Sequence, residues 1–438
     1  MGKAYIDTCS EQYNNPRLLF KKEFRDIIME ADSQILIKPD EIEIKDKRFF
    51  QVDFVKAVMI FLVIFDHTIP WDPIKNELGV ALWERISIPV FLVIMGFNMG
   101  LSFSKMEDKR LRKLYSWRYF KKKFWRYIYP FIVLWIVSSL IGLAINGFDL
   151  DALNQYEEGA WDFEHLFIGI IPFWGPGNWF LPVIFWTILL LPLLYKGFSG
   201  KLIWRILTLL LCYAIELSIQ LVLFNIFDQY DFPTLEAYFE FRYWYYFIAT
   251  TPFFMLSAIG LGMWFSKKPN LFAKQNLFMW ILLPLSLYYL IQYQFFGFSY
   301  EFIRGDYNLF VFPYSAFLVL LGIKLLPKRW DNWFTKAIST IGKSTYHILL
   351  TQILYFSVTI SLYGDHYGAS IFGINTIYDF PLNNADFLTI LGSLLINWGI
   401  CIPFGVFWYY VDFELRNYYT RHKKHKYDKE ESYILEKS

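Results

Sequence analysis

The chain has 438 residues, of which 55% are hydrophobic and 21% aromatic, with a mean hydropathy of +0.30 and a formal net charge of only +2. Apolar runs long enough to cross a bilayer recur along it, and this excludes a soluble enzyme. We expect a lipid bilayer as its surroundings and no nucleic-acid partner.

The first 48 residues are polar, mixed in charge and without the short apolar core of a cleavable signal peptide. We interpret residues 1–48 as a cytosolic N-terminal segment of unassigned role. The three cysteines, Cys9, Cys212 and Cys401, are far apart and match neither a disulfide framework nor a metal-ligand spacing. We therefore expect no metal site and no permanently bound cofactor.

Ten candidate membrane-spanning helices follow, and together they predict an all-α integral membrane protein built as a single bundle. Between the third and the fourth lies HLFIGIIPFWGPGN, residues 165–178, which is too short to span and is broken by proline and glycine. We interpret it as a re-entrant or interfacial segment. The predicted spans are 52–69, 86–103, 125–146, 179–195, 203–225, 244–265, 277–296, 307–326, 338–362 and 387–412.

The basic residues of the connections give the orientation, because Lys and Arg gather on the cytosolic side of membrane proteins. Thirty Lys and Arg residues lie in residues 37–51 before the first span, in every second connection and in the tail, whereas the alternate connections hold four. This alternation predicts that both termini are cytosolic and that residues 413–438 form a basic cytosolic tail.

The first predicted helix carries Lys56 and His67, eleven residues apart. At 100° per residue this spacing brings His67 to within about 20° of Lys56, roughly 16 Å further along the axis. The residues between them are apolar except for Asp66, so either side chain is costly in lipid unless it faces the protein interior or water. We predict that Lys56 and His67 line one face and look into a shared cavity.

A histidine near a helix end can simply cap that end, but its neutral imidazole is also the usual general base near pH 7. Asp53, three residues before Lys56, is interpreted as an ion-pair partner of that lysine. On the fifth predicted helix Glu216 and Gln220 are one turn apart, and both packing and a substrate path stay open for them.

The third predicted helix begins at its cytosolic end with Lys123 and Arg126, which are one turn apart and are expected to face the same way. Two cations at the mouth of a bundle can bind phosphates, arginine with two hydrogen bonds and lysine as a point charge. Membrane topology alone also accounts for a basic cluster at this place, so both interpretations stay open.

Several stretches together resemble acyltransferase family 3, the integral-membrane O-acyltransferases that include polysaccharide O-acetyltransferases. That family has an aspartate, then Arg or Lys, ten residues and His on its first helix, similar to Asp53, Lys56 and His67. Lys123 and Arg126 resemble its RxxR motif, with lysine in place of the commoner arginine. Gln352 stands where many members have histidine, and we assign it no catalytic role. Further similar stretches are PVFLVIMGF at 89–97, PFIVLW at 130–135, NWFL at 178–181 and GKSTYHILLTQ at 342–352.

The resemblance implies an acyltransferase-like transmembrane domain over residues 49–412, in the cell membrane. It implies transfer of an acyl group, most often acetyl, from acyl-CoA as co-substrate to a hydroxyl of a carbohydrate or a lipid-linked sugar. In that interpretation His67 is the general base, Lys56, Lys123 and Arg126 bind the donor, and Asp53 supports Lys56. The alternatives are a multi-pass transporter or flippase of a polysaccharide precursor and a non-catalytic scaffold.

Overall fold

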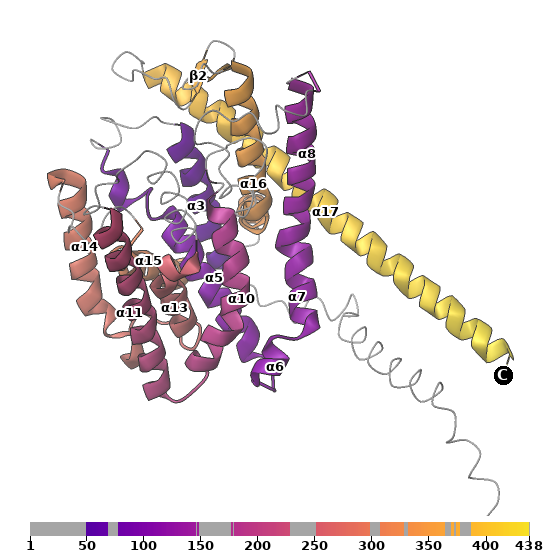
Figure 1. Ribbon diagram of the computed structural model, residues 1–438, viewed down its shortest axis with the longest axis horizontal. Helices are drawn as coiled ribbons and strands as arrows, with labels where there is room; N and C mark the ends of the chain where they lie inside the picture. The colour runs from indigo at the N-terminus through magenta and orange to yellow at the C-terminus, as the bar shows by residue number, and fades with distance from the viewer. Residues whose placement is uncertain are drawn as a thin grey trace, which may run out of the picture. The chain divides into compact units, whose positions relative to one another are not determined.

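The computed structural model describes residues 50–68, 78–145, 147–148, 177, 179–227, 251–297, 307–327, 332–363, 369–371, 374–376 and 387–437 (Figure 1). All of them belong to one compact unit, Phe49–Ser438. The predicted cytosolic segment 1–48 and, apart from Gly177, the predicted re-entrant segment 165–178 lie outside the described residues.

The described part of the chain is almost entirely helical, as predicted (Figure 1). Three short 3-10 helices, η1 (Val80–Leu82), η4 (Pro252–Met255) and η5 (Lys274–Asn276), join larger elements. One antiparallel hairpin pairs β1 (Ala369–Ile371) with β2 (Ile374–Thr376), with Ala369 opposite Thr376. The larger helices are α3 (Phe50–Thr68), α5 (Ser87–Ser104), α6 (Leu111–Leu114), α7 (Trp117–Lys123), the π-helix η2 (Phe124–Ile128), α8 (Tyr129–Ile145), α10 (Phe180–Phe198), α11 (Leu202–Phe227), α13 (Leu256–Phe265), α14 (Met279–Phe296), α15 (Phe312–Leu325), α16 (Trp333–Tyr363) and α17 (Phe387–Lys437).

Each of the ten predicted spans overlaps one of these helices, but only six helical stretches of the described chain are long and apolar enough to cross a membrane. Two more apolar helices, 252–265 and 312–325, are shorter. Helix α3 carries three charged residues besides its histidine, and α16 is interrupted by polar residues. The count of ten spans and the cytosolic termini therefore stay predictions. The six stretches are Val80–Ser104, Leu111–Ala144, Phe180–Phe198, Leu202–Val222, Lys274–Phe296 and Ile390–Tyr419.

Helix α16 packs against α3 and against α17, and small residues allow both approaches. At Gly342 the backbone of Asp53 takes the place that a side chain would occupy, and at Gly405 the backbone of Ile348 does the same. Close approach of this kind, with no side chain between the helices, is the usual way in which apolar helices pack in membranes. It brings the polar side chains of α3 and α16 into direct contact.

Connections predicted to lie on the cytosolic side meet one another. Lys196 Nζ donates to the carbonyl of Lys109 at 3.4 Å, and Arg205 Nη1 donates to Gln275 Oε1 at 3.2 Å. Burial and the neighbouring charges of Lys109 and Arg205 lower the pKa of Lys267. Basic residues from three connections therefore share one end of the bundle, in keeping with the segregation of charge in the sequence.

Candidate active site

Lys56 lies in the contact between α3 and α16. Its ammonium group is 2.7 Å from Asp53 Oδ1 and donates to the Gly342 carbonyl at 2.5 Å. Ser339 Oγ lies 3.5 Å from the other carboxylate oxygen of Asp53. Asp53 thus balances the charge of Lys56 as predicted from their spacing, and the pair holds the first half of α3 against α16. The donor-binding role of Lys56 stays a prediction.

His67 lies eleven residues further along α3 and also contacts α16. Its ring meets that of Phe356 edge to face at 6.4 Å between centroids, and its side chain is 19% exposed. A Cβ atom at Gly177 would lie 3.7 Å from His67 Nε2 and 3.6 Å from Leu349 Cδ1. The predicted common face of Lys56 and His67 is therefore the face toward α16, and Nε2 points to the glycine that precedes α10.

A row of charged side chains lies behind the imidazole. His67 Nδ1 is 3.8 Å from Asp66 Oδ2, and Asp66 Oδ1 is 4.0 Å from Arg85 Nε. Arg85 Nε is in turn 3.4 Å from Glu84 Oε2, and both residues are buried just before α5. The Asp66 carboxylate thus lies on the Nδ1 side of the imidazole, and Nε2 is the nitrogen on the side of Gly177. Sequence reasoning missed this row, although Asp66 directly precedes His67.

Hydrogen bonds fix the end of α3 that carries His67. Asn397 Nδ2 of α17 donates to Thr68 Oγ1 at 3.0 Å, and Tyr355 OH of α16 donates to Asn397 Oδ1 at 2.9 Å. Trp398 Nε1 donates to the Phe61 carbonyl at 3.0 Å. Helices α16 and α17 therefore hold this end of α3, from which the imidazole projects.

Lys123 and Arg126 do not face the same way, contrary to expectation. Lys123 is buried, with Nζ 2.9 Å from Met99 Sδ and 5.4 Å from the centre of the Tyr127 ring. Arg126 is exposed, and its Cζ lies 5.4 Å from the same ring. The α-helical spacing fails because the chain forms a π-turn over Phe124–Ile128, which displaces the residues that follow. Both cations still flank one aromatic ring.

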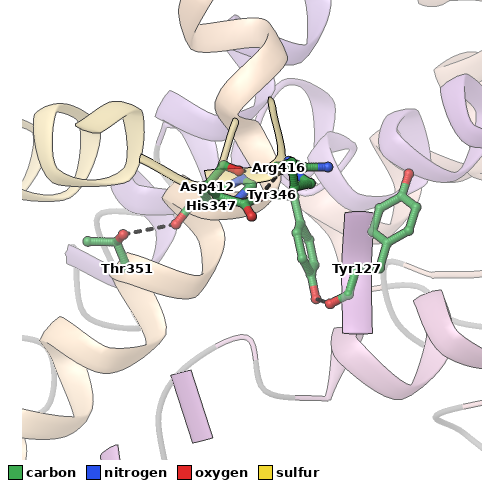
Figure 2. A network of polar contacts seen from close by, with 6 residues as sticks. All are labelled: Tyr127, Tyr346, His347, Thr351, Asp412 and Arg416. Carbon is green, nitrogen blue, oxygen red and sulfur yellow. Dashed lines mark hydrogen bonds and ion pairs between the residues drawn. The ribbon is translucent and has the colours of Figure 1, made fainter. Parts of the chain in front are cut away.

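Tyr127 connects this basic turn to α16, as Figure 2 shows. Tyr346 OH donates to the Tyr127 carbonyl at 2.7 Å. Gln352 follows Tyr346 by six residues on the same helix, a rise of about 9 Å. Helix α16 therefore runs from the cations to the surroundings of His67.

A second histidine that the sequence reasoning did not select joins α16 to α17 (Figure 2). His347 Nε2 is 3.1 Å from Asp412 Oδ2, and Arg416 Nη2 reaches the same oxygen at 2.5 Å. His347 and Asp412 are buried, whereas the Arg416 side chain is 29% exposed. Thr351 Oγ1 donates to the His347 carbonyl at 2.9 Å. The contact between His347 and Asp412 joins α16 to α17, and this cluster therefore fastens the two helices to each other.

Membrane-length apolar helices and an imidazole held among charged groups define a multi-helix membrane protein with a polar site between α3 and α16. The chain belongs to acyltransferase family 3, since the family model described as an acyltransferase domain matches residues 49–406. This confirms the resemblance inferred from the motifs and places the protein among the acyltransferases. Comparison with curated proteins and with solved structures found no match.

Proposed function

We propose that the protein transfers an acyl group, acetyl in the first instance, from acyl-CoA to a hydroxyl of a cell-envelope sugar or lipid-linked precursor. Membership of the acyltransferase family supports the class of reaction. The observation that carries the proposal is the setting of His67, whose Nδ1 lies beside Asp66 and whose Nε2 points toward Gly177.

In the proposed reaction His67 Nε2 takes the proton of the acceptor hydroxyl while that oxygen attacks the thioester carbonyl carbon. The new C–O bond forms, the C–S bond breaks, and the imidazolium returns its proton to the thiolate of CoA. The Asp66 carboxylate beside Nδ1 stabilises the imidazolium formed on the way. General-base catalysis of this kind contributes about 10²–10⁴-fold.

The donor in this proposal enters from the cytosolic side, where its phosphates meet Arg126 and Lys123. Lys123 supports this assignment because its described contacts are a methionine sulfur and aromatic rings, and no carboxylate of the described chain pairs with it. A buried ammonium group without an anionic partner favours an anionic ligand. The pantetheine arm would then follow α16 toward His67, and the protein would act in the cell membrane.

The test uses the purified protein in detergent, acetyl-CoA with a radiolabelled acetyl group, and membranes of the expressing cells as the source of acceptor. We expect label in the acceptor fraction and release of free CoA. His67→Gln keeps a side chain of similar size without a base, so kcat should fall about 10²–10⁴-fold at an unchanged melting temperature.

His347→Gln is the matched control, because it changes a buried histidine on the neighbouring helix α16. It should lower thermal stability and preserve the rate of the folded protein. Wild-type protein that neither transfers acetyl groups nor releases CoA contradicts the proposal and favours the transporter alternative.

A further inference from the structure

Gln352 is a polar residue to which the reaction proposed above gives no role. Its side chain is fully buried on α16, and neither amide atom forms a hydrogen bond with any residue in the part of the chain that the structure describes. Two buried serines of this helix are satisfied locally, since Ser344 and Ser357 each donate to a carbonyl four residues earlier. A buried amide without partners costs free energy, so its retention requires a reason.

The position of Gln352 supplies that reason. A Cβ atom at Gly177 would lie 3.8 Å from Gln352 Nε2 and 3.7 Å from His67 Nε2. The two nitrogens are thus separated by no more than the sum of these distances, and both border the space that Gly177 leaves open. Leu349, one turn before Gln352, borders the same space, and Phe356, one turn after it, contacts the imidazole ring of His67. The unpartnered amide and the imidazole converge from two helices.

We propose that Gln352 is a catalytic residue that donates a hydrogen bond from Nε2 to the carbonyl oxygen of the acyl group. The inference rests on the proposed function and adds an electrophilic partner for His67. While the acceptor oxygen bonds to the carbonyl carbon and His67 takes its proton, the carbonyl electrons move onto the oxygen, which Gln352 stabilises as an oxyanion. Collapse of this intermediate re-forms the carbonyl, breaks the C–S bond and frees the CoA thiolate to take the proton.

An amide suits this task at this place in the bundle. It carries two N–H donors, it does not titrate, and it brings no net charge into an apolar environment. A donor already fixed beside the reacting carbonyl has no reorganisation to undergo when charge develops on the oxygen. The packing of α16 against α3 holds Gln352 and His67 at a constant separation.

The experiment compares Gln352→Leu and Gln352→Glu with the wild type in the labelled-acetyl assay. Leucine removes both unsatisfied atoms, so the melting temperature should stay the same or rise, while kcat falls about 10²–10³-fold at an unchanged KM for acetyl-CoA. Glutamate keeps the shape and removes the N–H donors, so its kcat should fall at least as far. A residue that merely supports the fold would lose stability in the leucine variant.

Gln220→Leu is the matched control. Gln220 is also buried with both amide atoms unpartnered among the described residues, but it lies on α11, which packs on α10, α13 and η4. Its leucine variant should keep the wild-type kcat. A wild-type rate in Gln352→Leu, with His67→Gln inactive, overturns this inference and leaves the proposed function standing. A wild type without turnover refutes both.

Discussion

Gly177 gives the sharpest test of the space between His67 and Gln352. Its φ angle is +92°, so Gly177→Ala strains the backbone and should cost roughly 1–2 kcal/mol of stability. The new methyl would lie 3.7 Å from His67 Nε2 and 3.8 Å from Gln352 Nε2, in contact with both and in collision with neither. Reacting atoms need hydrogen-bond distances of about 2.6–3.2 Å to such groups, and the methyl occupies that volume. We expect kcat to fall about 10²-fold or more, measured as labelled acetyl transfer.

Gly297→Ala separates the effect on the space from the effect on the backbone. Gly297 ends α14 with a φ of +61°, and a Cβ there would meet nothing within 4 Å. This variant should lose similar stability in a thermal unfolding assay and keep its rate. If Gly177→Ala retained the activity of Gly297→Ala, the space at Gly177 would not be where the reaction takes place.

Two further predictions concern the two cations Lys123 and Arg126 and the contact of His347 and Asp412 between α16 and α17. Arg126→Gln should raise the KM for acetyl-CoA about tenfold, equivalent to about 1.4 kcal/mol, without changing kcat. Lys123→Met, which places an apolar side chain beside Met99, should raise the same KM and leave stability unchanged; unaltered KM values in both variants would assign these cations to topology alone. Asp412→Ala removes the shared partner of His347 and Arg416 and should cost about 3 kcal/mol, the low end for a broken buried pair because Arg416 stays partly exposed. Thermal unfolding in detergent measures this loss of stability. An unchanged melting temperature would contradict the role of Asp412 in holding α16 against α17.

The positions of the helices followed from the sequence because long apolar runs and alternating basic connections are local signals. The contacts between helices did not follow from it. His347 and Asp412 lie 65 residues apart, and no local pattern links them. The π-turn at Phe124–Ile128 likewise has no periodic signature in the sequence. The spacing of an α-helix therefore placed Lys123 and Arg126 on one face, although the two side chains face different ways.

The approach of Lys56 and His67 to a common neighbour could be predicted from the sequence, whereas the places of Arg85 and Gln352 could not. The spacing of Lys56 and His67 requires only the period of one helix, and both side chains do meet α16. Arg85 is one of the four basic residues of the alternate connections, and its approach to Asp66 depends on how the chain turns before α5, which no local pattern predicts. Gln352 departs from the pattern of its family, and only burial beside Gly177 gives it a role.

Among the described helices, α3 and α16 are long enough to cross a membrane but too polar to count as apolar spans, and these two carry the proposed chemistry. Their polar side chains are tolerated because α3, α16 and α17 satisfy one another, Lys56 through Gly342 and Thr68 through Asn397. Such pairing cancels the cost of polarity and so cannot by itself indicate catalysis. Gln352 differs because its amide has no counterpart in the described chain and borders the same space as His67. Natural sequences keep locally unfavourable residues chiefly where function requires them, and this space is therefore where we expect substrate to bind.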